Sequence, residues 1–479
     1  MFLRQLFAAS LLALAAFVPA SLAQNAPAPN PAAPEDTRTL EQRIADLQGI
    51  VAKLQARLDR LEKIDQLEKN APSAAAAAQP ATQQSAALAP APSQPVPVPA
   101  PNPVSNAVPP NTTINFFLDG YYGYNFNDPI GRVNLLRAYD VSSNAFSINQ
   151  AGVIFENAAD PDHGKRFGLR LDFQYGQATQ ASQGNPLNEP RPEIYRNIFQ
   201  AYGTWVAPIG KGLTIDVGKF ASSLGYEGNY TKDQINYSRS FWFNFLPFYH
   251  LGARLNYKFN DKFAVNYWLV NGTNQSEPFN GFKDEFFGLS FTPTKNITWN
   301  AQYYLGQEHP DVVYFPNGGA PPDAPTLQGV PFEPVPNPAH GKLHIFDTYV
   351  SWQLTPRWLA AVEADDFIQR LNANSYPVHT DGGAAYLRYQ FTSKTYLGTR
   401  AEYLADRGGS FTGITQAVKE LTITLSHRFD EGFQVMGEWR RDFSNQPYFY
   451  TNTLGILKKE QNTATLGLLW WFGEKQGAW

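Results

Sequence analysis

The chain has 479 residues, no cysteine and a formal net charge of −4 at pH 7. The lack of cysteine excludes disulfide bonds and thiolate metal sites, and the small net charge argues against nucleic acid as a partner. An aromatic content of 14% beside only 17% charged residues is typical of a β-barrel that faces lipid and needs aromatic girdles at both interfaces.

Residues 1–23 have the pattern of a secretory signal peptide. Arg4 supplies a positive charge, an apolar run follows at 6–18, and Ser-Leu-Ala at 21–23 fits a small-x-small cleavage site. The run is too short to span a bilayer, and no later segment offers the roughly eighteen apolar residues of a membrane helix. An N-terminal membrane anchor is the alternative. We expect export, with 24–38 as a short flexible segment.

Residues 39–70 are predicted to form a periplasmic coiled coil. Because one helix cannot bury a strict 4-3 apolar stripe alone, we expect self-association. The expected assembly is a homotrimer, a number that the leucines of the seam do not fix by themselves. The alternative is a single amphipathic helix lying on another surface. The apolar seam consists of Leu40, Ile44, Leu47, Val51, Leu54, Leu58 and Leu61.

An Ala/Pro-rich linker follows at 71–111. Residues 71–110 contain 13 Ala, 11 Pro and no charged residue, so they cannot build a core and serve as a spacer. The part after Ala89, which is dense in proline, should be extended and semi-rigid. A spacer of this length would let the coiled coil approach the peptidoglycan layer.

From Thr113 onwards apolar and polar residues alternate with a period of two, which predicts strands with one apolar and one polar face. In the segment 165–176 (KRFGLRLDFQYG), large apolar residues occupy odd positions, while Arg170, Asp172 and Gln174 occupy even ones. We expect about sixteen such strands, at 113–126, 145–157, 165–176, 194–206, 211–220, 248–260, 262–271, 284–292, 296–307, 342–354, 357–367, 383–391, 394–406, 418–429, 432–443 and 461–472.

The expected connections alternate in length. Those after even-numbered strands are mostly short, and those after odd-numbered strands are long, such as 221–247 and the proline-rich 308–341. Short periplasmic turns, long external loops and an even strand count are typical of outer-membrane barrels. A soluble sandwich is the alternative, but its strands average only about five or six residues. The predicted fold class is all-β: a transmembrane antiparallel β-barrel of about 16 strands over 112–479, preceded by a short α-helical coiled coil.

Three blocks of the chain, at 197–227, 236–263 and 465–479, resemble the OmpL-like family of outer-membrane β-barrel porins. The resemblance covers 112–479. It implies an outer-membrane channel surrounded by lipid and supplies no catalytic residues. The short periplasmic turns and the even strand count place both ends of the barrel, and with them the N-terminal extension, on the periplasmic side. One departure concerns the terminal aromatic that closes such barrels: alternation stops at Phe472, and Trp479 follows a polar tail. We expect the two aromatics to share that role.

Enzymatic chemistry is not indicated. Ser426 and His427 lie in the middle of a predicted strand, without a recognisable nucleophile motif around them. His340 and His344 lie at a loop-to-strand junction, where their spacing does not bring the side chains together. We therefore expect no enzyme activity, no cofactor and no metal site.

Strand parity places a nearly balanced set of charges on the inward face. Such charges either pair across strands for stability, or form an eyelet whose transverse field orders permeating solutes. The inward cations are Arg166, Arg170, Arg254, Lys258, Arg388, Arg400, Arg428 and Arg440, and the inward acids are Asp119, Asp172, Asp216, Glu363, Asp365, Glu402, Glu438 and Asp442. The expected pore-lining residues are Arg170, Asp172, Arg254, Lys258, Arg388, Arg400, Glu402, Arg428, Glu438 and Arg440.

The loop 221–247 is the third external loop, which in general porins folds into the lumen. It carries Glu227, Asp233 and Arg239, the expected constriction residues, and its apolar part, 241–245, should pack against the wall or enter the sixth strand early. A loop folded outward as a lid or trimer latch is the alternative. We expect Glu227 and Asp233 to face some of the arginines Arg170, Arg254, Arg388, Arg400 and Arg440.

These features together predict a water-filled channel for passive diffusion of ions and small hydrophilic solutes, because a barrel of about sixteen strands leaves an aqueous lumen. The alternative is a structural envelope tether whose barrel mainly anchors the coiled coil.

Overall fold

A computed structural model describes residues 111–183, 189, 192–315, 318–429 and 432–473. The predicted signal peptide, the segment 24–38, the coiled coil, the linker up to residue 110 and Trp479 lie outside the described residues.

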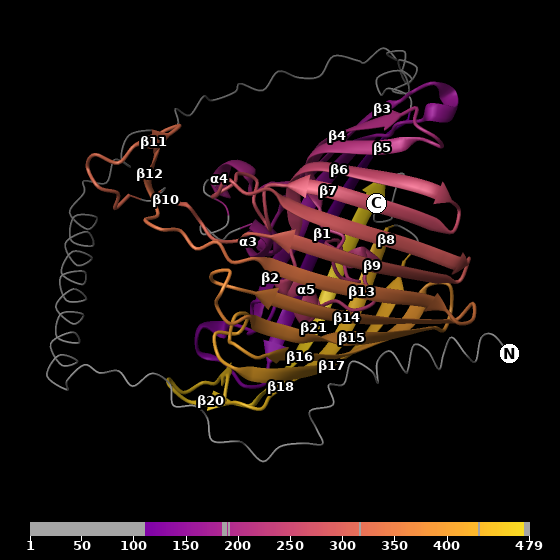
Figure 1. Ribbon diagram of the computed structural model, residues 1–479. Coiled ribbons are helices and arrows are strands. Elements are labelled where there is room, and N and C mark those ends of the chain that lie inside the picture. The colour runs from indigo at the N-terminus through magenta and orange to yellow at the C-terminus, as the bar shows by residue number, and fades with distance from the viewer. Residues whose placement is uncertain (1–110, 184–188, 190–191, 316–317, 430–431, 474–479) are drawn as a thin grey trace, which may run out of the picture. The chain divides into compact units, whose positions relative to one another are not determined.

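Sixteen antiparallel strands form a closed barrel, in which each strand pairs with its neighbours in chain order (Figure 1). The last strand pairs with the first from Asn115↔Gly473 to Asn125↔Thr463, so the sheet has no free edge. The predicted all-β barrel of sixteen strands is confirmed. The strands are β1 (Thr112–Asn125), β2 (Ala145–Asn157), β3 (Phe167–Tyr175), β4 (Ile198–Ala207), β5 (Leu213–Ala221), β6 (Tyr249–Asn260), β7 (Phe263–Val270), β8 (Asp284–Thr294), β9 (Ile297–Gly306), β13 (Leu343–Gln353), β14 (Trp358–Gln369), β15 (Val378–Gln390), β16 (Thr395–Asp406), β17 (Gln416–Arg428), β18 (Phe433–Ser444) and β21 (Glu460–Gly473).

Each expected strand has its counterpart, and the largest error is at β15. This strand begins at Val378 instead of residue 383. The glycines Gly382 and Gly383 interrupt the alternation, although the backbone before them still pairs with β14, as in His379↔Ile368. A hydrogen-bonded ladder needs no side-chain pattern, so the pattern underestimates the strand.

Short and long connections alternate along the barrel, as expected. Short turns such as the one between β6 and β7 gather at one end, on the right in Figure 1, and the long connections gather at the other. The connection from β9 to β13 carries a three-stranded sheet of β10 (Val312–Tyr314), β12 (Val330–Pro334) and β11 (Thr326–Leu327). A second small sheet joins β19 (Phe449–Tyr450) to β20 (Leu457–Lys458).

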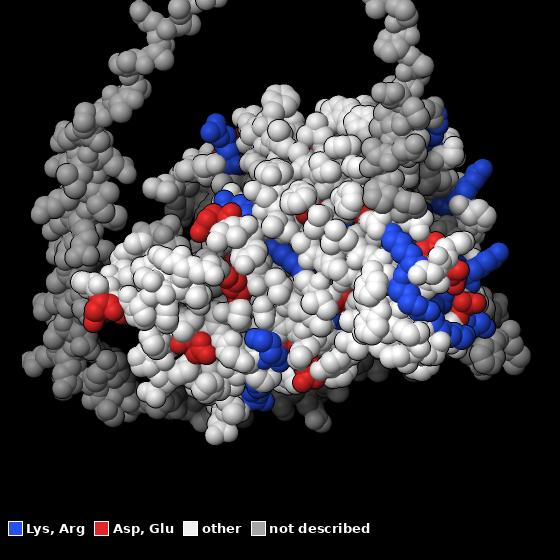
Figure 2. Space-filling model, turned by 90° about the horizontal axis from the view of Figure 1, so that it is seen from above, with Lys and Arg blue, Asp and Glu red and all other residues white. Residues whose placement is uncertain are grey.

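The two faces of the barrel differ in polarity. On β1, Asn115 and Asp119 point inward and are buried, whereas Phe116 and Leu118 point outward and are exposed. Figure 2 shows one face on which uncharged side chains cover most of the surface and the charged ones gather most densely at one end. This matches the cost of placing charge against hydrocarbon. None of the helices within the described ranges is long and apolar enough to span a membrane.

The barrel interior is occupied by the connection between β5 and β6, residues 222–248, here called the inner loop. It contains the short helices η5 (Thr231–Asp233) and α5 (Phe241–Phe245). The inner loop hydrogen-bonds to inward side chains of distant strands: Tyr237 to Asp119 of β1, and the Tyr226 amide to Glu363 of β14. The first long connection contributes the buried Arg137 and Tyr139.

The apolar segment 241–245 forms α5 and does not enter β6 early, because that strand begins at Tyr249. Ser240 caps the helix: its hydroxyl accepts a hydrogen bond of 2.9 Å from the Phe243 amide. Phe241 and Trp242 are completely buried and pack in the largest apolar cluster of the interior.

Candidate functional site: the charged wall and the inner loop

The ten side chains predicted to line a pore fall into three groups. Arg170, Asp172, Arg400, Glu402, Glu438 and Arg440 are buried in the inner wall, and Arg254 and Arg388 are partly buried. Lys258 lies at the rim instead, where its side chain is 64% exposed and pairs with Asp261 at 3.1 Å. Arg428 is exposed at the end of β17, and its guanidinium donates to the Lys232 carbonyl at 3.1 Å.

The main feature of the wall is a row of alternating charges across β16, β17 and β18. We call it the charge row and define it as Arg400, Glu420, Arg440, Asp442 and Arg137. Successive members pair through nitrogen–oxygen distances of 2.8, 3.3, 2.8 and 2.8 Å. Their side chains are at most 1% exposed. Buried ions in this state are tolerated because each has an opposite partner.

Two members of the charge row are absent from the sequence prediction. Glu420 shares the inward parity of Arg428 on β17, so the signal was available. Arg137 lies in the first long connection and also pairs with Asp140 at 3.0 Å. That connection has no period-two pattern, so no local signal could place Arg137 inside the barrel.

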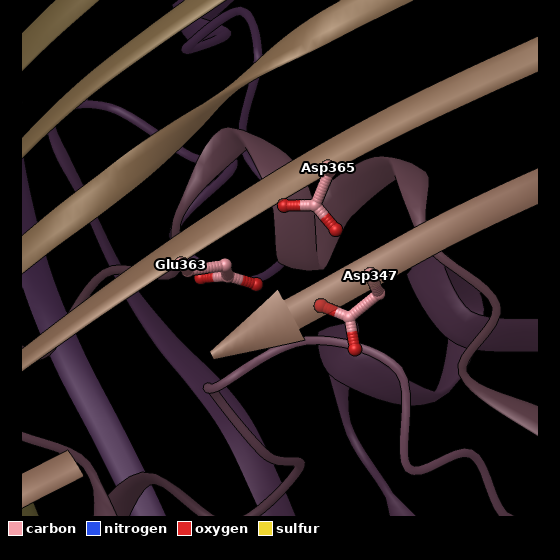
Figure 3. A group of neighbouring side chains, drawn as sticks. All are labelled: Asp347, Glu363 and Asp365. Atoms are coloured by element: carbon pink, nitrogen blue, oxygen red, sulfur yellow. The ribbon is translucent and has the colours of Figure 1, made fainter. Parts of the chain in front are cut away.

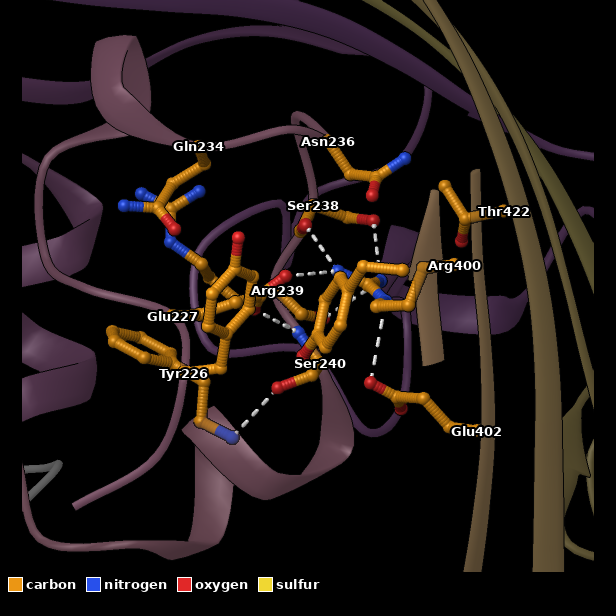
Figure 4. A network of polar contacts seen from close by, with 12 residues as sticks. Tyr226, Glu227, Gln234, Asn236, Ser238, Arg239, Ser240, Arg400, Glu402 and Thr422 are labelled. Atoms are coloured by element: carbon orange, nitrogen blue, oxygen red, sulfur yellow. Dashed lines mark hydrogen bonds and ion pairs between the residues drawn. The ribbon is translucent and has the colours of Figure 1, made fainter. Parts of the chain in front are cut away.

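The inner loop is attached to the charge row through Arg400 (Figure 4). One guanidinium nitrogen of Arg400 lies 2.7 Å from Glu227 Oε1 and also donates to the Ser238 carbonyl at 2.8 Å. Glu227 Oε2 accepts from the Ser240 amide at 2.6 Å. The loop residue Glu227 thus meets one of the five arginines expected to face it.

Other wall acids accept hydrogen bonds from the backbone of the inner loop. Glu402 accepts from the Phe241 amide at 2.8 Å, and Glu438 accepts from the amides of Tyr237 and Ser238 at 2.6 and 3.0 Å. Charge-assisted hydrogen bonds of this kind are among the stronger ones in proteins. They fix the path of the loop along the wall.

The expectation for Asp233 is wrong. Its carboxylate pairs with the neighbouring Lys232 at 2.7 Å and not with any of the five arginines. The 3-10 turn η5 places both side chains together, near Arg428. Burial raises the pKa of Asp233 and lowers the pKa of Lys232. The opposite charge of the neighbour acts against each shift: Lys232 lowers the pKa of Asp233, and Asp233 raises the pKa of Lys232.

Arg239 holds the inner loop in its folded shape. It is fully buried and donates to the carbonyl oxygens of Gly228, Tyr237 and Asn229 at 3.0, 2.9 and 2.9 Å. Its guanidinium also lies over the ring of Tyr139, 4.8 Å from the centroid. Most of its hydrogen bonds therefore go to the backbone of the inner loop itself.

Further arginines lie on the wall formed by β3 to β6. Arg170 pairs with Asp172 at 2.9 Å, and Arg254 pairs with Asp216 at 2.7 Å. Arg254 also stacks over Phe220, 4.6 Å from the ring centroid. Partnered guanidinium groups therefore line this part of the interior.

At one place on the inner wall, the neighbouring charged side chains of strands β13 and β14 are all acidic. The carboxylates of Asp347, Glu363 and Asp365 form a cluster, here called the acid triad, in which one ligand atom of each lies within 4.8 Å of the others (Figure 3). All three residues are buried. Glu363 and Asp365 were expected to face inward. Asp347 shares its inward face with the apolar Leu343 and Ile345, so parity alone did not mark it as polar.

The histidine and serine candidates do not come together. His344 bonds to Tyr303 and His340 to Gln307. Ser426 points inward and accepts a hydrogen bond from Gln434, whereas His427 bonds to Thr395 on the neighbouring strand. Adjacent strand residues face opposite sides of a sheet, so Ser426 and His427 cannot act as a pair.

Solved structures similar to the chain are outer-membrane proteins at low identity. A loop-deletion form of OmpT from Vibrio cholerae is 12% identical with a TM-score of 0.47, covering 75% of this chain and 99% of that one. An anion-selective porin from Comamonas acidovorans is 7% identical with a TM-score of 0.48 and the same coverage. The channel DcaP of Acinetobacter baumannii is 9% identical with a TM-score of 0.47, covering 75% and 97%.

No curated protein sequence matches the chain. A family model, described as "Putative beta-barrel porin-2, OmpL-like", matches residues 111–472, which is nearly the whole barrel and includes the inner loop, the charge row and the acid triad. The chain belongs to this family of OmpL-like outer-membrane β-barrel porins.

Proposed function

We propose that the protein forms a water-filled channel for passive diffusion of ions and small hydrophilic solutes across the outer membrane. The observation that carries the proposal is the inner loop, which lies inside a closed barrel and is bound to its charged wall. A barrel of sixteen strands is wide enough for an aqueous lumen. The inner loop, which enters this lumen, narrows the water path without blocking it.

The constriction is proposed to lie between the inner loop and the opposite wall. Glu227 meets Arg400 in the middle of β16, whereas Lys232 and Asp233 lie beside Arg428 at the end of β17, so the loop and the wall carry both signs of charge at two levels along the lumen. The proposed pore-lining residues are Arg254, Arg388 and Arg428, which keep accessible surface. The other expected wall residues, such as Arg400 and Arg440, are buried, and Lys258 lies at the rim. Opposed charges at a narrow place orient the dipoles of passing solutes.

The proposed assembly is a homotrimer in outer-membrane lipid, with the N-terminal coiled coil in the periplasm within reach of peptidoglycan. Support comes from the 4-3 apolar seam of 39–70. One solved form of OmpT from Vibrio cholerae is described as a trimer.

Planar-bilayer recording with the purified full chain tests the channel. We expect stepwise insertions with an ohmic conductance in KCl. Barrels that are shown to be folded by their heat-dependent mobility on gels, and yet give no conductance, would contradict the channel and leave the envelope tether as the function.

A further inference from the structure

The acid triad differs from the other acids of the inner wall because no arginine among the described residues pairs with it in the way that Arg254 pairs with Asp216 or Arg440 pairs with Asp442. Asp365 is 5% exposed, and both of its carboxylate oxygens lack a hydrogen-bond partner among the described residues. Asp347 Oδ1 is in the same state. Buried polar atoms without partners are uncommon and point to an ion or water that belongs at the site.

The remaining oxygens of the triad are held by donors. Glu363 accepts from the Tyr226 amide and from the Tyr386 hydroxyl, each at 3.0 Å. Asp347 Oδ2 accepts from the Gln302 side-chain amide at 2.6 Å. Hydrogen bonds of this kind favour ionised carboxylates and orient them, as the outer-shell partners of metal ligands do. Figure 3 shows the three carboxyl groups next to one another. The oxygens without a partner, those of Asp365 and Oδ1 of Asp347, are the ones available to a bound ion.

Three carboxylates enclosed at this distance repel one another when all are ionised, so either bound protons or a cation must compensate their charge. The ligand atoms lie within 4.8 Å of one another. Oxygens on opposite sides of a Ca²⁺ ion are about 4.6–5.2 Å apart, whereas those on opposite sides of Mg²⁺ are about 4.0–4.2 Å apart. The limit of 4.8 Å admits either ion, and Ca²⁺ is favoured because it accepts irregular sets of carboxylate oxygens, whereas Mg²⁺ demands near-ideal octahedral geometry and usually keeps several waters.

We infer that the acid triad binds one Ca²⁺ ion, with Asp347 from β13 and Glu363 and Asp365 from β14 as its protein ligands. Through the hydrogen bond from the Tyr226 amide to Glu363, the ion also supports the inner loop. Gly225 allows this close approach: its φ of +85° is in the left-handed region, and a Cβ there would lie 3.1 Å from Glu363 Oε1. The site does not depend on whether the channel conducts.

Terbium luminescence tests the site, because Tb³⁺ replaces Ca²⁺ and tyrosines can sensitise its emission. The Tyr386 hydroxyl bonds to the ligand Glu363 directly, and the Tyr226 ring packs against the Tyr386 ring in a tilted arrangement with a centroid distance of 4.8 Å. The full chain, folded in detergent and treated with EGTA, is titrated with TbCl3 and then with CaCl2. We expect saturable emission at one Tb³⁺ per chain, displaced by Ca²⁺.

Two variants and one control locate the ion. Asp365→Asn and Asp347→Asn each remove one ligand charge while keeping side-chain volume, and should weaken Tb³⁺ affinity at least about tenfold. Asp216→Asn removes a wall acid that has its own arginine and should leave affinity unchanged. Asp347→Asn serves if Asp365→Asn does not fold.

Three outcomes would overturn the site. The first is a folded wild type without sensitised emission, as expected if shared protons compensate the triad. The second is equal affinity in the triad variants and the wild type. The third is an equal loss in Asp216→Asn, which would indicate general attraction of cations to the lumen.

Discussion

Arg400 Nη1 lies 2.7 Å from Glu227 Oε1, and this ion pair joins strand β16 to the inner loop. Arg400 does not depend on Glu227 for its own neutralisation, because its Nε also pairs with Glu420 at 2.8 Å and Glu402 at 3.2 Å. The pair therefore acts mainly on the loop. Removing the charge of Glu227 should weaken one attachment of the loop without leaving an isolated buried arginine, while the hydrogen bonds to Glu402 and Glu438 remain.

Glu227→Gln should shift the reversal potential toward anions under a salt gradient, since it removes a negative charge at the proposed constriction. It should also lower the free energy of unfolding by about 1.5–3 kcal/mol, the usual contribution of a hydrogen bond to a charged group. Bilayer recording and urea unfolding measure the two effects. Glu333→Gln, in the long connection after β9, is the control and should change selectivity much less. Equal shifts in both variants would place the constriction elsewhere.

Acidification should remove the negative charge of Asp233 earlier than that of an exposed aspartate. Burial raises the pKa of Asp233 above its usual value of 3.8, so the group takes up a proton at a higher pH. Lys232, whose pKa burial lowers, remains protonated as the pH falls. The net charge of this pair therefore becomes positive, and anion preference should rise as the pH is lowered from 7.

Reversal potentials recorded between pH 7 and pH 4 measure this step. Asp233→Asn should abolish it and show the acidic selectivity at every pH. Asp261→Asn, which removes an exposed acid at the rim, should keep it. An unchanged pH profile in Asp233→Asn would assign the titration to another group.

The strands could be predicted from the sequence because a barrel wall imposes a strict chemical alternation. One face of β1 meets lipid with Phe116 and Leu118, and the other meets polar side chains with Asp119. The same rule failed where a face lacks its usual chemistry. Because Gly382 and Gly383 interrupt the alternation, the start of β15 was not predicted. Because Leu343 and Ile345 on the same face are apolar, Asp347 was not predicted to point inward.

The partners of the inner loop could not be predicted to the same degree. Parity places Arg400 on the inner wall, but Glu227, which it contacts, lies 173 positions away in the chain. Which arginine meets which loop acid depends on the path of the loop, which η5 and the hydrogen bonds of Arg239 determine. Asp233 was misplaced for this reason, since a single turn directed it to Lys232.

Deletion of 39–70 should convert the purified protein from trimer to monomer if the apolar seam from Leu40 to Leu61 holds the chains together. Mass measured by light scattering in detergent, with the detergent contribution subtracted, decides the matter. A matched variant that replaces Leu47 and Leu54 by Ala should weaken the assembly in the same direction. An unchanged mass in the deletion would leave the barrel itself as the oligomerisation element.

Arg440 and Arg441 offer a matched comparison of a buried and an exposed ion pair on one strand. They are adjacent on β18 and point to opposite faces. Arg440 is fully buried and pairs with Asp442 at 2.8 Å and Glu420 at 3.3 Å. Arg441 pairs with Glu460, and its side chain is 48% exposed. Both arginines lie within ion-pair distance of their acidic partners, so distance alone does not predict which pair contributes more to stability.

Arg440→Met should lower the free energy of unfolding by about 3–5 kcal/mol, because it leaves buried carboxylates short of a partner. Arg441→Met should lower it by at most about 1 kcal/mol, because water and ions already screen an exposed pair. Urea unfolding of the full chain measures both values. Added salt should change the Arg441 effect and leave the Arg440 effect nearly constant. Similar losses in the two variants would mean that water reaches the charge row, and that the inner loop does not seal that part of the wall.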